Sequence, residues 1–136
     1  MNPVVHFEMP YEDRDRMIDF YAKTFGWVAE KLGPEMGSYA VIATSERDPK
    51  THFPKQVGMI NGGFYKKPED KLGQHPSVVI AVPDIAAALK NVAAAGGKVL
   101  GEPMDIPGYG LYAGFVDTEG NRVSMMQPYP MMGGKA

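Results

Sequence analysis

Apolar and polar positions along the chain alternate in two successive series of strands and helices. Residues 4–9 are mostly β-branched or aromatic, which predicts a strand. A helix is expected over residues 13–25, because one face of its 3.6-residue repeat carries Met17, Tyr21 and Phe25. Shorter apolar runs predict three further strands, at residues 27–32, 38–44 and 57–65.

The same order of elements begins again after a polar linker at residues 66–76. Residues 77–82 predict a strand, and Pro83 and Asp84 open a second helix that ends at Gly96. Three more strands are expected at residues 98–100, 111–116 and 122–127. An offset of 71 residues (84 − 13) aligns the first elements of the two series and places Asp13 on Asp84, Gly26 on Gly97 and His6 on Ser77. The offset fails after the third element because the loops differ in length.

This repeated order predicts an α+β fold of two βαβββ modules. A four-stranded sheet with one helix leaves one face uncovered, so two such sheets are expected to curl together around a central cup or to pair with another chain. We interpret residues 1–136 as a single domain with four parts: module one at about 3–65, the linker at 66–76, module two at about 77–128 and a tail at 129–136.

Composition narrows the classes of function. Fourteen basic and sixteen acidic residues give a net charge of −2, which argues against a nucleic-acid surface. The absence of cysteine excludes thiol nucleophiles and thiolate metal sites. The longest uncharged stretches have 12 residues, shorter than the roughly 20 of a membrane span. We therefore expect a cytoplasmic protein that binds neither membrane nor nucleic acid.

Several short strings resemble the vicinal oxygen chelate superfamily. In module one they are HFEMP at residues 6–10 and FGW at 25–27; in module two they are VPDI at 82–85 and DTEGN at 117–121. This superfamily includes glyoxalase I, extradiol dioxygenases, fosfomycin resistance proteins and bleomycin-binding proteins. The sequence Asn-Gly-Gly at residues 61–63 is similar to that of small predicted glyoxalase-related members. The resemblance implies the paired βαβββ fold and a homodimer.

The resemblance also implies a divalent metal, held by His, Glu or Gln from the first and fourth strands of each module. Here those positions carry His6, Ser77 and Ser124, and residues 59–64 contain neither a carboxylate nor an imidazole. Tight binding with an open position needs about three protein ligands. We therefore expect no metal and no other cofactor.

His6 and Glu8 are the candidate catalytic pair, because residues two apart lie on the same face of a strand. They could act as a general acid and base, or bind the polar end of a ligand. The simpler alternatives are a histidine that only bonds a neighbour and a solvated glutamate. A mostly apolar ligand pocket is expected from Met59, Asn61, Gly63, Ser77, Ser124 and Met126, with Tyr39 or Tyr112.

The first hypothesis for function is a metal-free protein that binds a small organic molecule, of the glyoxalase/bleomycin-resistance type. The alternative is a lyase or isomerase that acts on a carbonyl or enediol substrate through His6 and Glu8. A metal-dependent glyoxalase or dioxygenase is the third possibility. In the homodimer, the apolar residues 128–132 are expected to lie against the partner subunit or across a cavity mouth.

Overall fold

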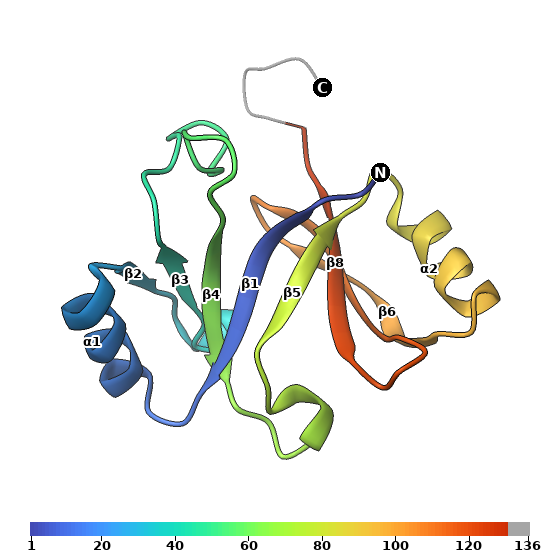
Figure 1. The fold of residues 1–136 in the computed structure, drawn as a ribbon, viewed down its shortest axis with the longest axis horizontal. Coiled ribbons are helices and arrows are strands. Elements are labelled where there is room, and N and C mark those ends of the chain that lie inside the picture. The colour runs from blue at the N-terminus through green and yellow to red at the C-terminus, as the bar shows by residue number, and fades with distance from the viewer. Residues whose placement is uncertain (131–136) are drawn as a thin grey trace. The chain divides into compact units, whose positions relative to one another are not determined.

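The structure is a computed structural model and describes residues 1–130. The chain divides into two compact units. We call residues 6–76 the N-terminal unit; residues 1–5 together with the chain from residue 77 onward form the C-terminal unit. Each unit is a mixed sheet with one helix, and the order of elements is βαβββ in both (Figure 1). The predicted α+β fold is confirmed.

The N-terminal unit places its strands in the order β2-β3-β4-β1. β1 and β4 run parallel, whereas β2–β3 and β3–β4 are antiparallel pairs. The elements are β1 (Val4–Tyr11), α1 (Arg14–Phe25), β2 (Val28–Lys31), β3 (Ala40–Ala43) and β4 (Asn61–Lys66), with short 3-10 turns at Pro34–Met36 and Lys71–Gly73. The first residues of β1 belong by contact to the C-terminal unit.

Helix α1 begins and ends where its capping residues predict. Asp13 accepts a hydrogen bond from the N–H of Arg16 and caps the N-terminus, and Gly26 has the left-handed φ of 75° that ends the helix. Met17, Ile18 and Tyr21 of the helix pack on a core of four buried residues, whereas Phe25 is 62% exposed. Trp27 stacks on Tyr21 at 4.6 Å between ring centroids. The core residues are Tyr11, Ala40, Ile42 and Phe64.

The C-terminal unit has the strand order β5-β8-β7-β6. Its elements are β5 (Ser77–Ala81), α2 (Ile85–Ala94), β6 (Lys98–Ile106), β7 (Gly110–Val116) and β8 (Arg122–Pro128). β5 and β8 are parallel, and the other pairs are antiparallel. Helix α2 covers one face, where Val82, Ile85, Ala113 and Met125 form the buried core.

Two strands differ by several residues from their predicted bounds, and the other differences are of one or two residues at an end. The strand expected at 57–65 begins only at Asn61, because Gly58 takes a left-handed φ of 89° and the preceding residues remain a loop. Conversely, β6 runs on to Ile106 past Gly101 and Pro103, which the sequence pattern reads as a stop. A register shift between Leu100 and Met104 absorbs these residues as an irregularity in the β6–β7 pair.

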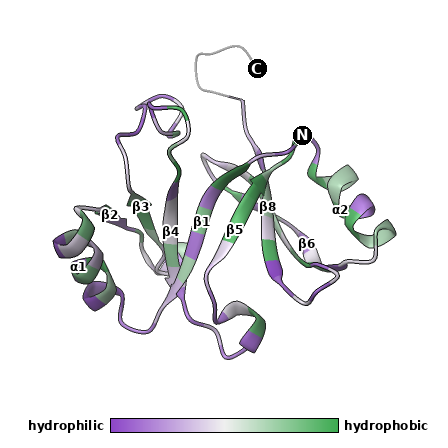
Figure 2. Ribbon diagram, in the orientation of Figure 1, coloured by the Kyte–Doolittle hydropathy of each residue, from purple (hydrophilic) through white to green (hydrophobic). Residues whose placement is uncertain are grey.

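The middle of β1 is more polar than β3 and β5 (Figure 2). Figure 2 colours the middle of β1 as hydrophilic, whereas β3 and β5 are coloured as hydrophobic.

The predicted role of the tail lies in part outside the described residues, since Met131 and Met132 fall beyond residue 130. Within residues 1–130, no helix is long and apolar enough to cross a membrane.

Candidate functional site

The polar side chains of β1 lie on the face of the N-terminal sheet opposite α1. Phe7 and Met9 pack against the core beneath α1. Successive side chains of a strand point to opposite faces, so His6 and Glu8 lie on the other face. Glu8 is buried, with 7% of its surface exposed. A buried carboxylate needs partners, because an unpaired charge in the interior is costly.

Tyr39 joins these two side chains. Its hydroxyl donates a hydrogen bond to Oε2 of Glu8 at 3.2 Å and lies 3.2 Å from Nε2 of His6. Since the single hydroxyl proton points to Glu8, Nε2 of His6 must carry the proton that Tyr39 accepts. The result is a chain of donors that runs from His6 through Tyr39 to Glu8.

The imidazole of His6 is neutral at pH 7. Burial lowers the pKa of His6 from 6.5 to about 4, because desolvation disfavours the charged ring. A group with this pKa is a weak base near neutrality and does not supply an imidazolium as the acid. Within the predicted pair, His6 is therefore a neutral hydrogen-bonding group near pH 7.

Gly63 is required by the position of Tyr39. A Cβ atom added to Gly63 would overlap the Tyr39 hydroxyl and ring. Gly62 has the same relation to Phe7 on the opposite face, where a Cβ would overlap the Phe7 ring. The paired glycines thus let one aromatic ring approach β4 from each side.

Asn61 supplies a buried donor on the same face as His6, its partner in the β1–β4 register. Its Oδ1 accepts hydrogen bonds from the backbone N–H of Thr44 at 2.9 Å and of Ser45 at 3.1 Å. Because both partners are donors, Oδ1 is assigned without ambiguity and Nδ2 points elsewhere. Nδ2 is buried and has no hydrogen-bond partner in the part of the chain that the structure describes.

Arg14 holds the backbone that presents Tyr39, a role that the sequence did not reveal. Its guanidinium donates to the carbonyl oxygens of Leu32 at 2.8 Å, Ser38 at 2.9 Å and Tyr39 at 3.3 Å. The hydroxyl of Tyr11 also donates to Ser38 O, at 2.8 Å. Ser38 has a left-handed φ of 54°, a conformation that these bonds support.

Among the predicted pocket residues of the C-terminal unit, Ser124 is fully buried. Its Oγ lies 2.6 Å from the Tyr112 hydroxyl and accepts a hydrogen bond from Nη1 of Arg122 at 3.2 Å. Met126 follows on the same face by alternation, opposite the core residue Met125. Ser77 Oγ is buried without a hydrogen-bond partner among the described residues.

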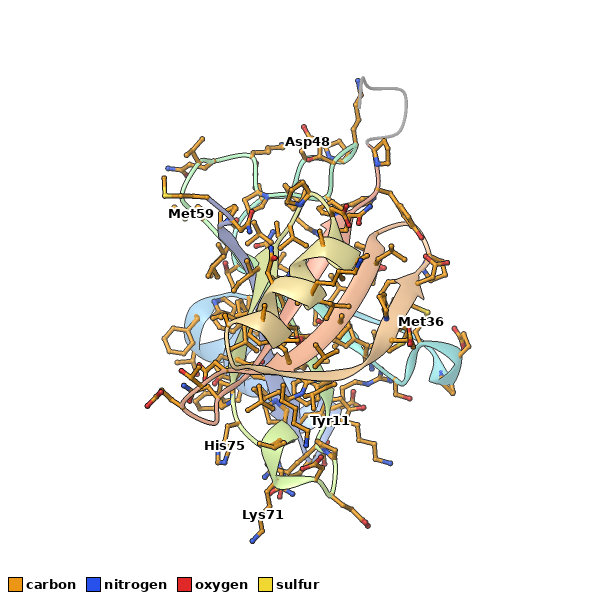
Figure 3. The ribbon with its side chains drawn as sticks, turned by 90° about the vertical axis from the view of Figure 1, so that its right-hand side faces the viewer. Tyr11, Met36, Asp48, Met59, Lys71 and His75 are labelled. Atoms are coloured by element: carbon orange, nitrogen blue, oxygen red, sulfur yellow. The ribbon has the colours of Figure 1, made fainter. Side chains whose placement is uncertain are left out.

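Met59 is placed differently from the prediction. It lies in the loop before β4 rather than on the strand, and it is 44% exposed. Figure 3 shows its side chain at the margin of the ribbon. The N-terminal unit therefore brings together His6, Glu8, Tyr39, Asn61 and Gly63, without Met59.

The donor set does not fit a divalent metal. Among residues 1–130, no group of three or more His, Asp or Glu side chains could hold an ion. On the face opposite α1, the partner of His6 in β4 is Asn61, whose oxygen already accepts backbone hydrogen bonds. A site with an open coordination position needs about three such ligands. The side chains on this face therefore do not make up a metal site.

Comparisons with known proteins agree with this fold. DnrV of Streptomyces peucetius, an anthracycline biosynthesis protein, is 30% identical over 117 residues, which are 84% of this chain and 42% of DnrV. CFP32 of Mycobacterium bovis is 39% identical over 69 residues, 51% of this chain and 26% of CFP32. The chain thus spans less than half the length of these relatives.

Solved structures extend the comparison to lower identity. The methylmalonyl-CoA epimerase of Streptomyces coelicolor superposes with a TM-score of 0.68 at 16% identity, covering 96% of this chain and 97% of the epimerase. At this identity the likeness establishes the fold. The family profile of the Glyoxalase/Bleomycin resistance protein/Dioxygenase superfamily matches residues 4–125, so nearly the whole chain is covered. The chain belongs to the Glyoxalase/Bleomycin resistance protein/Dioxygenase superfamily.

Proposed function

We propose that this chain binds a small organic molecule on the face of the N-terminal unit opposite α1. In this proposal an acceptor oxygen of the ligand, such as a carbonyl, receives a hydrogen bond from Nδ2 of Asn61. The observation that carries the proposal is the buried Nδ2 donor, which has no partner among the described residues. Such donors are uncommon in folded proteins and call for an explanation.

The energetic argument favours a ligand as that partner. A buried donor without an acceptor costs about 1 to 3 kcal/mol. Two backbone N–H groups hold the Asn61 side chain through Oδ1, so its orientation is fixed before any ligand arrives. A preorganised donor loses little conformational freedom on binding. A ligand carbonyl at this point therefore gains a full hydrogen bond.

The ligand class is inferred from this donor together with a relative's name. DnrV is named for anthracycline biosynthesis, and anthracyclines are planar ring systems with quinone carbonyl oxygens. Such a molecule offers acceptors for Asn61 on a largely apolar body, as ligands of mostly apolar sites with few polar anchors do. We therefore propose a carbonyl-bearing aromatic compound of this type as the ligand.

The test is a titration followed by the fluorescence of an anthracycline. Asn61→Asp keeps the oxygen that accepts from Thr44 and Ser45 but replaces the Nδ2 donor with an acceptor. We expect saturable binding to the unmodified protein and an affinity at least about tenfold lower for Asn61→Asp, equivalent to about 1.4 kcal/mol. Asn91→Asp, on the exposed surface of α2, is the matched control and should bind normally. Equal affinities for all three proteins would contradict the proposal.

A second candidate function is that of a lyase or isomerase acting on a carbonyl substrate. The observation that favours it is the chain from His6 through Tyr39 to Glu8. Glu8 would remove a proton from the carbon next to the carbonyl, with Tyr39 as the relay, and would return the proton after the enediol has rearranged. His6 would remain neutral and orient Tyr39.

Solvent exchange tests this second function. Incubation with hydroxyacetone in deuterated water would incorporate deuterium next to the carbonyl if Glu8 acts as the base. Glu8→Gln should abolish enzyme-dependent incorporation, while Glu12→Gln, an exposed carboxylate beside Lys67, should leave it unchanged. Incorporation at the rate of the uncatalysed reaction in the unmodified protein would leave only the binding function.

The chain is also proposed to act as a homodimer. Phe20, Phe25 and Val28 are large apolar side chains that are more than half exposed on α1 and β2. Exposed apolar groups of this kind are typical of association surfaces when they adjoin one another. Sedimentation should give a mass of roughly 30 kDa, twice the 14.8 kDa of one chain. A mass of one chain at micromolar concentration would contradict the dimer.

A further inference from the structure

Arg122 occupies an unusual place in the C-terminal unit. Its guanidinium lies against the backbone of β7 at Gly114, where an added Cβ would be 3.0 Å from Nη2 and 3.4 Å from Cζ. Gly114 therefore leaves the room that the guanidinium plane occupies. Arg122 shares its face of β8 with Ser124, opposite the face that α2 covers.

A hydrogen bond to a buried side chain holds the guanidinium of Arg122. Nη1 donates to Oγ of Ser124 at 3.2 Å, and that oxygen also bonds the Tyr112 hydroxyl at 2.6 Å. Ser124 is fully buried, so this anchor is shielded from water. A guanidinium carries five N–H donors in a fixed plane, and the bond to Ser124 uses one of them.

Within residues 1–130, Arg122 forms no ion pair with a carboxylate. The ion pairs within residues 1–130 join other cations to acidic groups: Lys31 to Asp15, Arg47 to Glu30, Lys55 to Glu46 and Lys67 to Glu12. All four of these pairs lie in the N-terminal unit. A partly buried cation is stabilised by a paired anion with good geometry, and here no described side chain supplies one.

The geometry points to an oxyanion site at Arg122, which takes a carboxylate or phosphate group of a bound small molecule. The planar fork of Arg122 matches both oxyanions and binds them through paired N–H donors. Ser124 holds the guanidinium through a hydrogen bond, and Tyr112 in turn bonds Ser124. Gly114 leaves the space that the guanidinium occupies. The inference rests on the proposed function in one respect, that the anion belongs to the bound molecule.

The experiment uses simple anions rather than the anthracycline, so its outcome is independent of the test at Asn61. The Nε–H signal of Arg122, identified by its absence in Arg122→Gln, is followed by NMR during titration with benzoate, phenyl phosphate and uncharged benzyl alcohol. We expect saturable shifts with at least one anion and none with benzyl alcohol. The anion that binds more tightly identifies the carboxylate or the phosphate as the preferred group.

Variants complete the test. Arg122→Gln should lose saturable anion binding, whereas Arg16→Gln, which removes an exposed guanidinium of α1, should retain it. Arg122→Lys keeps the charge without the planar fork and should weaken binding about fivefold or more. It also provides a second variant if Arg122→Gln does not fold. Absence of saturation with both anions, or equal binding by Arg122→Gln, would overturn the inference and leave the proposal at Asn61 untouched.

Discussion

The two units have the same strand order and register, but they carry different polar side chains at equivalent positions. In the N-terminal unit, Glu8 on β1 is level with Gly63 on β4 and Val41 on β3. In the C-terminal unit, the corresponding row is Val79 on β5, Ser124 on β8 and Gly114 on β7. The strand registers therefore coincide. Glu8 and Val79 keep the offset of 71 residues that aligned the starts of the two halves, whereas the later strands have other offsets because the loops differ in length.

The comparison shows which feature the two units share. Tyr39 lies two residues before Val41, and Tyr112 lies two residues before Gly114, so the two tyrosines are equivalent. The hydroxyl of each points to the same strand position, which is Gly63 in one unit and Ser124 in the other. Both units thus have a tyrosine whose hydroxyl lies at the equivalent position of the neighbouring strand.

The groups around these tyrosines differ in charge. His6, Glu8 and Asn61 of the N-terminal unit correspond to Ser77, Val79 and Arg122 of the C-terminal unit. One unit combines a carboxylate with a neutral imidazole, and the other offers a cation. Repetition of a scaffold therefore fixes where polar groups can lie, while individual substitutions decide what each unit binds.

Alanine in place of Gly63 of the N-terminal unit should have the largest effect, and Gly114 of the C-terminal unit provides the comparison. Gly63→Ala forces Tyr39 away and breaks its bonds to His6 and Glu8, so we expect a loss of about 3 to 4 kcal/mol in the free energy of unfolding. Gly114→Ala meets only the end of the flexible Arg122 side chain and should cost less than about 1.5 kcal/mol.

Chemical denaturation of both glycine variants measures these values. In a Tyr39→Ala background, the additional cost of Gly63→Ala should fall to about 1 kcal/mol or less, because the overlapping ring is gone. An unchanged cost in that background would show that Tyr39 is not the group that requires glycine.

Acid should weaken the N-terminal unit through His6. The pKa of His6 is about 4 in the folded chain and 6.5 in an unfolded one, so protons bind preferentially to the unfolded state between these values. Its contribution to stability is fully present above pH 6.5 and is lost as the pH falls towards 4. From pH 7 to about pH 4.5 the loss should be about 2 to 3 kcal/mol.

His6→Gln provides the matched measurement. It removes the titrating group, so urea denaturation at the two pH values should show a smaller difference for this variant than for the unmodified protein. A chain whose stability changes by the same amount with and without His6 would show that other groups cause the acid sensitivity. His75, an exposed residue, is the control position for the substitution.

Removal of the two equivalent hydroxyls should have unequal effects. Tyr39→Phe leaves the buried Glu8 without one charged hydrogen bond, and we expect a loss of about 2 kcal/mol. Tyr112→Phe loses a neutral bond to Ser124, which still has Arg122, and should cost about 1 kcal/mol. Equal costs from thermal denaturation would contradict the difference in charge between the two units.

Substitution of Arg14 should have the smallest effect on stability. Arg14→Lys keeps the charge but cannot reach the carbonyls of Leu32, Ser38 and Tyr39 together, and should cost about 1 kcal/mol. Its distinctive readout is the pKa of His6, measured by NMR. If Arg14 positions Tyr39, that pKa should move back towards 6.5; a pKa that stays near 4 would assign Arg14 a structural role only.

The sequence contained enough information for the fold but not for all of the site. Caps such as Asp13 and Gly26 are local signals, and the structure confirms both. The alternation of side chains predicted that His6 and Glu8 share a face, whereas the pairing of His6 with Asn61 depends on long-range strand register, which no local pattern specifies. The sequence did not predict the roles of Arg14 and Arg122. Arg14 contacts backbone that is distant in the sequence, and Arg122 lies beside Gly114, so neither contact produces a local sequence pattern.

The donor at Asn61 can be observed directly through its side-chain amide signals. These signals are identified by their absence from the spectrum of Asn61→Asp, and they are followed while an anthracycline is added to the unmodified protein. The proposal predicts that the Nδ2 protons shift downfield and saturate at one ligand per chain, as a buried donor gains an acceptor. Saturable binding that leaves both Nδ2 protons unshifted would contradict it.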